Sequence, residues 1–132
     1  MRYLFFLVLF SFLWSQDFTT LFEVDVRMRV VNDDLLYVVV QIDNNSGRTV
    51  TEIEGYITEV DPKNNIVSEL RIVHLHNYEP PLRNGHTVVR GVTYSFNLSQ
   101  DYRYRYHTCH LKFKGDDRIF IYSPAGELLR ID

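Results

Sequence analysis

The chain has 132 residues, of which 45% are hydrophobic and 23% are charged, and its formal net charge at pH 7 is −3. This length predicts one domain, and the composition is that of a folded protein rather than a disordered one. A weakly acidic chain lacks the positive field that duplex nucleic acid selects, so we expect no nucleic-acid partner. Nine Tyr and nine Phe favour β-strands.

Residues 1–15 have the layout of a secretory signal peptide. Arg2 supplies a positive charge, Tyr3–Trp14 is an uncharged and mostly apolar run, and Ser15 is a small residue at its end. The alternative is a membrane anchor, but the run is shorter than the roughly 18–20 apolar residues that span a bilayer. We therefore expect cleavage after Ser15, export to the periplasm or the medium, and a mature single domain of residues 16–132 without a membrane span.

Cys109 is the single cysteine of the chain. An exported domain with one cysteine has no intramolecular disulfide, so the side chain is either buried as a small hydrophobic group or kept as a free thiol. The sequence leaves both alternatives open. A domain of this size buries roughly two-thirds of its unfolded surface, which is enough to fold without a covalent bridge.

Alternation of apolar and polar residues dominates the mature chain. In Leu21–Val31 the even-numbered residues are apolar and the odd-numbered ones from Glu23 to Arg29 are charged, which predicts a strand with one solvated face. Leu35–Asp43 is apolar on both faces through Val40, which is typical of a central strand covered on both sides. The same reasoning predicts further strands at Val50–Val60, Ile66–His76, Val88–Leu98, Tyr102–Lys114, Arg118–Tyr122 and Leu128–Ile131.

Turn-forming residues separate these strands. Asn, Asp and Gly cluster at 32–34, 44–47 and 61–65, and Pro80 and Pro81 exclude a central strand from the loop between Asn77 and His86. Seven or eight short strands in a chain near one hundred residues predict an all-β fold, an antiparallel β-sandwich of the immunoglobulin or fibronectin type III kind. A small barrel is the structural alternative.

One stretch carries a recognisable residue pattern. An apolar strand leads into Asn44, Ser46, Gly47, Arg48 and Thr49, which fit N-x-S-G-(K/R)-T, and Asp61, Ile66, Leu82 and Gly85 follow. These residues resemble a pattern of bacterial envelope sandwich modules, the FxLYD-like group, over about half of the mature chain. The resemblance implies an accessory or adhesive role and no shared catalytic residues. Turn chemistry explains the residues as well, because Gly47 tolerates positive φ and Asn44 can cap the turn.

Two groups of residues are of metal-ligating type. His74 and His76 are two positions apart on one predicted strand, so both rings would lie on one face, and His107, Cys109 and His110 lie close together on another strand. Imidazole and thiolate bind Zn and Cu. On an alternating strand, however, His107 and Cys109 point one way and His110 the other. We predict no cofactor, and we keep an envelope Zn- or Cu-binding protein as the alternative function.

Tyr102, Tyr104 and Tyr106 lie on one predicted strand face, with Arg103 and Arg105 on the other. The Tyr face is either a stacking surface for sugar rings or single-stranded nucleic acid, or a row of core residues. We favour the core interpretation. The position of Tyr104 also fits a tyrosine corner, in which the hydroxyl bonds to nearby backbone.

Catalytic motifs are missing from the sequence: it holds no G-x-S-x-G, no H-E-x-x-H and no glycine-rich phosphate loop. We therefore expect a protein that is not an enzyme and that binds another protein or a surface polymer of the cell envelope. The Asn77–His86 loop offers Tyr78, Leu82 and Arg83, side chains of the type that make binding hot spots, so we expect them to contact a partner. Edge strands offer backbone groups to a partner strand. The oligomeric state is left open.

Overall fold

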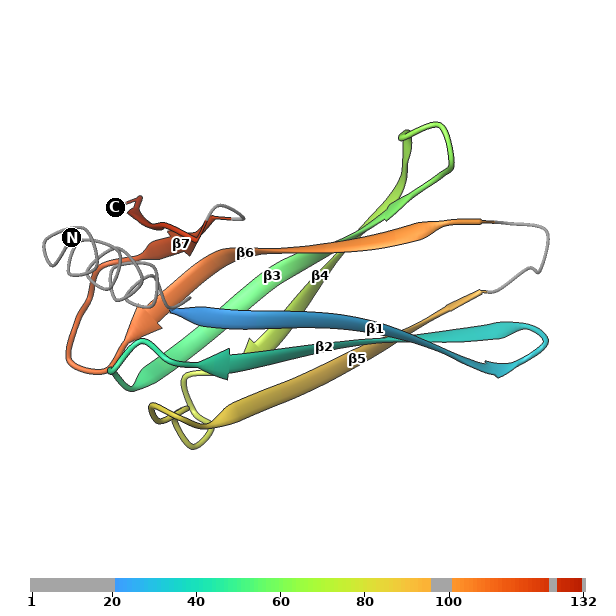
Figure 1. The fold of residues 1–132 in the computed structure, drawn as a ribbon. Helices are drawn as coiled ribbons and strands as arrows, with labels where there is room; N and C mark the ends of the chain where they lie inside the picture. Colours follow the sequence, from blue (N-terminus) through green and yellow to red (C-terminus); the bar gives the residue numbers. More distant parts are fainter. Residues whose placement is uncertain (1–20, 96–100, 124–125, 132) are drawn as a thin grey trace, which may run out of the picture.

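The computed structural model describes residues 21–95, 101–123 and 126–131, and these residues form eight strands and no helix (Figure 1). The predictions for residues 1–15 and for Leu98 lie outside the described residues. No helix long and apolar enough to cross a membrane occurs among those described. The strands are β1 (Phe22–Asn32), β2 (Leu35–Asn44), β3 (Val50–Val60), β4 (Ile66–Leu75), β5 (Thr87–Ser95), β6 (Arg103–Phe113), β7 (Phe120–Tyr122) and β8 (Leu128–Arg130).

The strands form two antiparallel sheets that face each other (Figure 1). One sheet has the order β1-β2-β5 and the other the order β4-β3-β6-β7-β8. This arrangement confirms the prediction of an all-β antiparallel sandwich, and each predicted strand that lies in the described residues is present with nearby ends. The alternation of side chains was sufficient to locate the strands because each sheet has one face on the core and one toward solvent.

β2 provides the inner face of the three-stranded sheet. Its even-numbered residues from Leu36 to Ile42 are buried, and their neighbours on β5 include Val88 and Val92. β2 is the middle strand, as predicted, but the prediction that both its faces are covered was wrong, since Tyr37 is exposed. The core that both sheets share consists of buried hydrophobic side chains: Phe22, Leu36, Val38, Val40, Ile42, Val50, Ile53, Ile57, Ile72, Leu75, Leu82, Val88, Leu111, Phe113, Phe120 and Tyr122.

Asn44 fixes one end of the sandwich. Its fully buried amide group donates to the carbonyl oxygens of Arg48 at 2.8 Å and Leu82 at 3.1 Å. Its carbonyl Oδ1 accepts from the Ser46 hydroxyl at 2.6 Å and from the Ser46 backbone N–H at 3.1 Å. Gly47 has φ of 78°, a conformation that Gly adopts without a Cβ penalty. Turn chemistry therefore accounts for the Asn-Asn-Ser-Gly segment, which also ties the β2–β3 turn to the 77–86 loop.

Candidate functional site

The structure separates the two histidines that were predicted to share a strand face. His74 is fully buried, with its ring edge-on to Tyr106 at 5.0 Å. His76 follows the end of β4 at Leu75 and stacks on Tyr78 at 4.9 Å. The pairing of β4 with β3 shifts at this point, which leaves His74 as an extra residue in the ladder. A β-bulge of this kind changes which side a residue faces, so the predicted His74/His76 pair was wrong.

His74 belongs to the core rather than to a surface site. Burial, and to a smaller degree the positive charge of Arg90, lower the pKa of His74 to about 4. Neither ring nitrogen has a hydrogen-bond partner within the described part of the chain. The ring is therefore neutral at pH 7 and acts as a packing group.

A second bulge rearranges the residues around Cys109. Glu54 pairs with His110 and Gly55 pairs with Thr108, so Cys109 is the extra residue on β6. Its Sγ lies 3.8 Å from Glu54 Oε1, and His110 Nδ1 lies 3.9 Å from the same oxygen. The prediction that Cys109 and His110 point in opposite directions was therefore wrong. The bulge brings both side chains to Glu54 on the outer face of the five-stranded sheet.

A cavity of about 350 Å³ lies on this outer face, where β3, β4 and β6 meet the start of the 77–86 loop. We call it the outer depression; it is lined by Glu52, Ile53, Glu54, Arg71, Val73, Leu75, His76, Asn77 and His110. Within the chain, Arg71 forms an ion pair with Glu54, and His110 Nε2 lies 3.2 Å from Glu52 Oε2. The depression therefore presents a polar surface.

The metal-ligating residues do not assemble into a ligand set. Among the described residues, no group of three or more His, Cys, Asp or Glu side chains is placed to hold a metal ion. His107 stacks on Tyr56 at 5.8 Å instead of joining Cys109. Burial, followed by the charge of Glu54, raises the pKa of the Cys109 thiol. A thiol with a raised pKa is a poor metal ligand and a poor nucleophile, since both roles need the thiolate.

The structure divides the three predicted contact residues of the 77–86 loop. Tyr78 is 80% exposed, and Arg83 is also exposed. Leu82 is only 7% exposed, because its backbone pairs with Val50 through two hydrogen bonds of 2.9 Å and its side chain enters the core. The prediction that Leu82 offers a contact surface was therefore wrong, whereas Tyr78 and Arg83 remain available to a partner.

Tyr78 is held on an ordered turn beside the outer depression. Glu79 Oε1 accepts the backbone N–H of His76 at 3.0 Å, and the backbone N–H of Glu79 donates to the His76 carbonyl at 3.0 Å. Arg90 donates to the other Glu79 oxygen at 2.9 Å. The His76 hydrogen bond is the main cause of the lowered pKa of Glu79. These bonds fix the turn, and the His76 ring supports that of Tyr78.

The tyrosines of β6 line the inside of the sandwich. Tyr104 donates to Glu59 Oε2 at 2.6 Å, and its ring lies 5.0 Å from that of Tyr94. The predicted tyrosine corner was therefore wrong, because the hydroxyl bonds to a buried carboxylate rather than to backbone. Glu59 also accepts from Ser68 at 3.0 Å. Sequence reasoning missed Glu59 because its position in an alternating strand resembles that of a solvated carboxylate.

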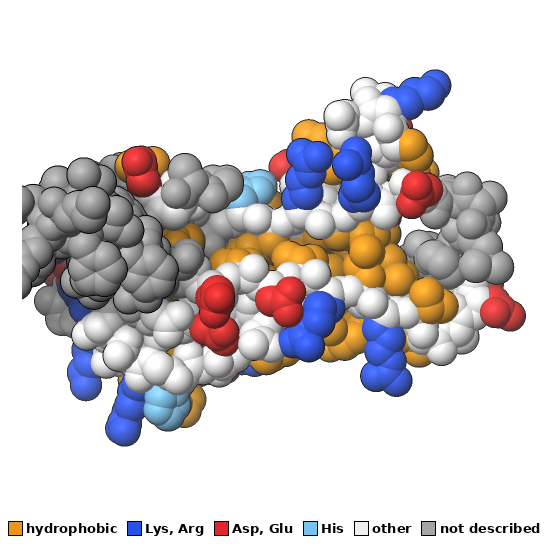
Figure 2. All heavy atoms as spheres, in the orientation of Figure 1, with side chains coloured by type: hydrophobic (Ala, Val, Ile, Leu, Met, Phe, Trp, Pro, Cys, Tyr) orange, Lys and Arg blue, Asp and Glu red, His pale blue; other side chains and the backbone are white. Residues whose placement is uncertain are grey.

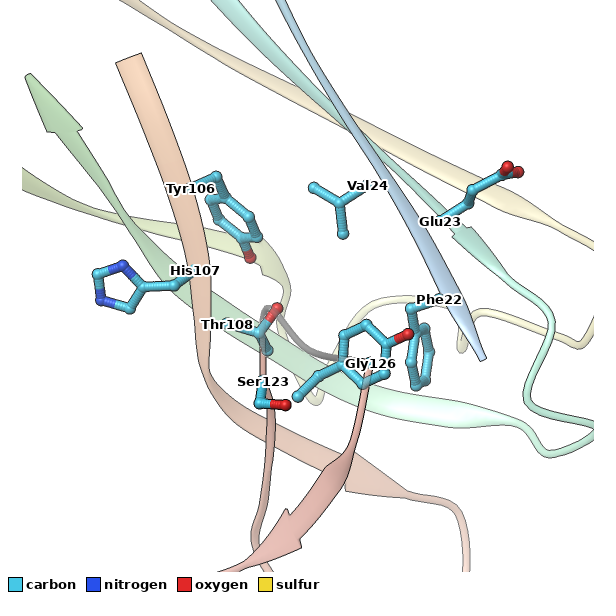
Figure 3. A pocket seen from close by; sticks show the side chains of 9 residues that line it. Phe22, Glu23, Val24, Tyr106, His107, Thr108, Ser123 and Gly126 are labelled. Carbon is cyan, nitrogen blue, oxygen red and sulfur yellow. The ribbon is translucent and has the colours of Figure 1, made fainter. Parts of the chain in front are cut away.

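A second cavity, of about 270 Å³, lies between β1 and β6 (Figure 3). Phe22 and Val24 of β1 and Tyr106 of β6 extend toward it, while the side chains of Glu23 and His107 point away. The two strands are the edges of opposite sheets over this stretch, because β6 pairs with β7 at Leu111 alone. No described strand therefore hydrogen-bonds the two sheets to each other on this side, and Tyr122, Ser123 and Gly126 complete the lining of the cavity.

No family model matches the chain, and no curated protein matches it. Several solved structures resemble it in shape, including the following two. One, from Bordetella pertussis, bears the provisional name ApaA protein; it is 13% identical, with a TM-score of 0.46 over 83% of this chain and 84% of that one. The other is the structural genomics target SoR45, 11% identical, with a TM-score of 0.44 over 85% of this chain and 83% of that one. Likenesses this weak say nothing about function.

Proposed function

We propose that this protein is an exported, non-catalytic β-sandwich module that binds another protein or a surface polymer of the cell envelope. The contact surface is the exposed ring of Tyr78, together with Arg83 and the outer depression. The observation that carries the proposal is the 80% exposure of Tyr78 on a turn fixed by Glu79 and by stacking on His76. Export rests on the signal-like residues 1–15.

A fixed and exposed tyrosine is a favourable contact for physical reasons. Tyr offers a large apolar face and a polar hydroxyl, and it loses little rotamer freedom on binding. Preorganisation by the His76 stack removes part of the remaining entropic cost. The adjacent polar rim of Glu52, Arg71 and His110 supplies hydrogen-bond donors and acceptors, as the rim of an interface usually does.

The chemistry of the outer depression supports a role in binding rather than in catalysis. The potential nucleophile beside it, Cys109, whose Sγ lies 3.8 Å from Glu54 Oε1, is kept as a thiol by burial and by Glu54. The carboxylate that would act as a base, Glu54, is engaged by Arg71. A thiol–imidazole dyad needs the opposite arrangement, a low thiol pKa and an imidazole within hydrogen-bond reach of sulfur.

The test is site-specific photo-crosslinking in cells of the source organism. A photoreactive amino acid replaces Tyr78 in one variant and Tyr37, which is exposed on the opposite sheet, in a control variant. We expect a defined adduct from position 78 and none from position 37, and protease or glycosidase treatment of the adduct then distinguishes a protein from a polymer. No adduct from position 78, or the same adduct from both positions, would overturn the proposed contact surface.

A further inference from the structure

β1 is the edge of the described three-stranded sheet, and much of its apolar row is exposed, although Phe22 is buried and Val26 is partly buried. Its even-numbered residues share the inner face with the buried residues of β2, yet Val24 is 37% exposed, Met28 55% and Val30 53%. Figure 2 shows hydrophobic side chains reaching the surface between the two sheets, with acidic and basic side chains along the border. Apolar side chains in a row on an unpaired edge are characteristic of a strand that pairs with another chain.

The backbone of β1 is also available for pairing. The N–H of Asn45 donates to the Leu21 carbonyl at 2.8 Å, which makes these opposite residues a hydrogen-bonded pair. Hydrogen-bonded pairs alternate along an antiparallel ladder, so the odd-numbered residues of β1 bond to β2. The N–H and C=O groups of Val24, Val26 and Met28 therefore point to the open edge, where no described strand pairs with them.

The charges of β1 are arranged symmetrically about Val26. On the outer face, Glu23 and Asp25 precede Val26, and Arg27 and Arg29 follow it at equal distances. If a second β1 lies antiparallel to the first with the two Val26 residues opposite each other, Glu23 faces Arg29 and Asp25 faces Arg27. Opposite charges directly across an antiparallel pair are stabilising. On the inner face the same register places Val24 opposite Met28.

We propose that β1 of one molecule pairs with β1 of a second copy, forming a symmetric dimer with a continuous six-stranded sheet. The register is Val26 opposite Val26, so the even-numbered residues whose backbone groups face the edge bond to each other. The same patch serves on both molecules, as a two-fold interface requires. The surface is distinct from Tyr78, which lies in the loop that follows β4 of the other sheet, so the dimer does not depend on the proposed function.

The charge pattern selects this register over its neighbours. Keeping the edge-facing groups opposite each other allows shifts that place Met28 opposite Val26, or Val24 opposite Val26. The first shift sets Arg27 against Arg27, and the second sets Asp25 against Asp25. Like charges directly opposite are destabilising. The existing ion pair between Arg27 and Asp25, at 3.1 Å, is 61% exposed on both side chains and is therefore easily exchanged for the intermolecular pair.

Charge-reversal variants of the purified protein test the proposal by sedimentation equilibrium. We expect the wild-type protein to dimerise with a dissociation constant on the order of micromolar to tens of micromolar, since the interface is a single strand edge. Asp25→Arg places two Arg opposite each other, and Arg27→Asp places two Asp opposite each other. Each single variant should weaken the dimer at least tenfold, and the double variant should restore it.

Mixing supplies the decisive comparison. Asp25→Arg and Arg27→Asp chains are complementary to each other, so an equimolar mixture should form a heterodimer although each variant alone is monomeric. Arg105→Asp, on β6, is the control and should leave the dimer unchanged. Circular dichroism melting checks that each variant folds. A wild-type protein that stays monomeric at several hundred micromolar, as it would if β1 served a different partner, overturns the proposal; so does a dimer that the single variants leave intact.

Discussion

The polar groups at Asn44 and those along β1 differ in whether they find hydrogen-bond partners within the described chain. At Asn44, a buried polar side chain is fully engaged by the turn that follows it and by Leu82 of the 77–86 loop. At β1, the edge-facing backbone groups have no partner among the described strands, and the side chains of Val24 and Met28 are 37% and 55% exposed. The end of the sandwich at Asn44, which we call the closed end, has its hydrogen bonds within one chain. The edge of the sheet at β1, which we call the open edge, obtains its hydrogen bonds from a second copy in the proposed dimer.

This difference separates the residues that determine the free energy of unfolding from those that determine association. Removing a member of a satisfied buried network leaves its partners unpaired, which costs the desolvation of each group. Removing an exposed side chain from an unpaired edge costs the monomer little. Substitutions at the closed end should therefore act on the free energy of unfolding, and substitutions on β1 should act on the association constant.

Asn44→Ala should have the largest effect on stability. It removes the two bonds to the carbonyls of Arg48 and Leu82 and the two bonds from Ser46, and each lost bond costs about 1 kcal/mol, so the free energy of unfolding should fall by roughly 4 kcal/mol. Urea unfolding followed by circular dichroism measures it. Asn45→Ala, at an exposed neighbouring position, is the matched control and should change little. Equal effects of the two variants would contradict the role of the Asn44 network.

His74 should make stability depend on pH. Its pKa is lowered from 6.5 to about 4 in the folded protein, so the unfolded chain binds the proton more readily between these values. The stability that the neutral His74 provides is fully present above pH 6.5 and is lost as the pH falls from 6.5 through 4. The lowering of the pKa corresponds to about 3 kcal/mol of unfolding free energy.

Urea unfolding at pH 7 and at pH 4.5, on wild type and on His74→Leu, isolates this contribution. The variant keeps the volume of the side chain and removes the titrating group, so its loss of stability between the two pH values should be clearly smaller. Identical pH dependence in both proteins would show that the buried imidazole is not the group responsible.

Tyr104→Phe should have an intermediate effect. The substitution removes the hydroxyl that donates to the buried Glu59 carboxylate, and hydrogen bonds to charged groups contribute about 1.5 to 3 kcal/mol. We expect a loss near the lower value, because Ser68 still donates to Glu59. Thermal melting measures it, with Tyr78→Phe as the control at an exposed hydroxyl. An unchanged melting temperature for Tyr104→Phe would mean that the Glu59 contact adds nothing to stability.

Met28→Gln should have the smallest effect on the unfolding of the monomer. The side chain is 55% exposed, so in dilute solution the free energy of unfolding should change by less than about 0.5 kcal/mol. In the proposed dimer Met28 faces Val24 of the second copy, so the same substitution should weaken association. A large loss of stability in dilute solution would place Met28 in the core of the monomer instead.

The sequence alone was sufficient to predict the sandwich and the approximate strand ends, because alternation along β1 to β6 reports directly on the two faces of each sheet. It failed where a bulge breaks the alternation. At His74 and at Cys109 the extra residue changes the facing of its neighbours. Gly55, a glycine inside β3, marks where the second shift falls, but alternation does not show which residues of β6 change sides. The consequence was a wrong histidine pair and a missed cluster at Glu54.

Two further features depended on contacts that are distant in the sequence. Leu82 lies in a proline-containing loop and looked available, but its pairing with Val50 buries it. The opposite charges on either side of Val26 were visible in the sequence, but their meaning depends on β1 being an edge strand, which the strand order alone reveals. Alternation predicts that a strand exists and cannot predict which strands are its neighbours.

Amide hydrogen exchange at two protein concentrations tests the central claim most directly, that β1 is completed by a second copy while the closed end is satisfied within the chain. The N–H groups of Val24, Val26 and Met28 should exchange rapidly in dilute solution and become protected as the concentration rises. The N–H of Val50, bonded to Leu82, should be protected at both concentrations. Rapid, concentration-independent exchange at Val26 in concentrated protein would contradict the account.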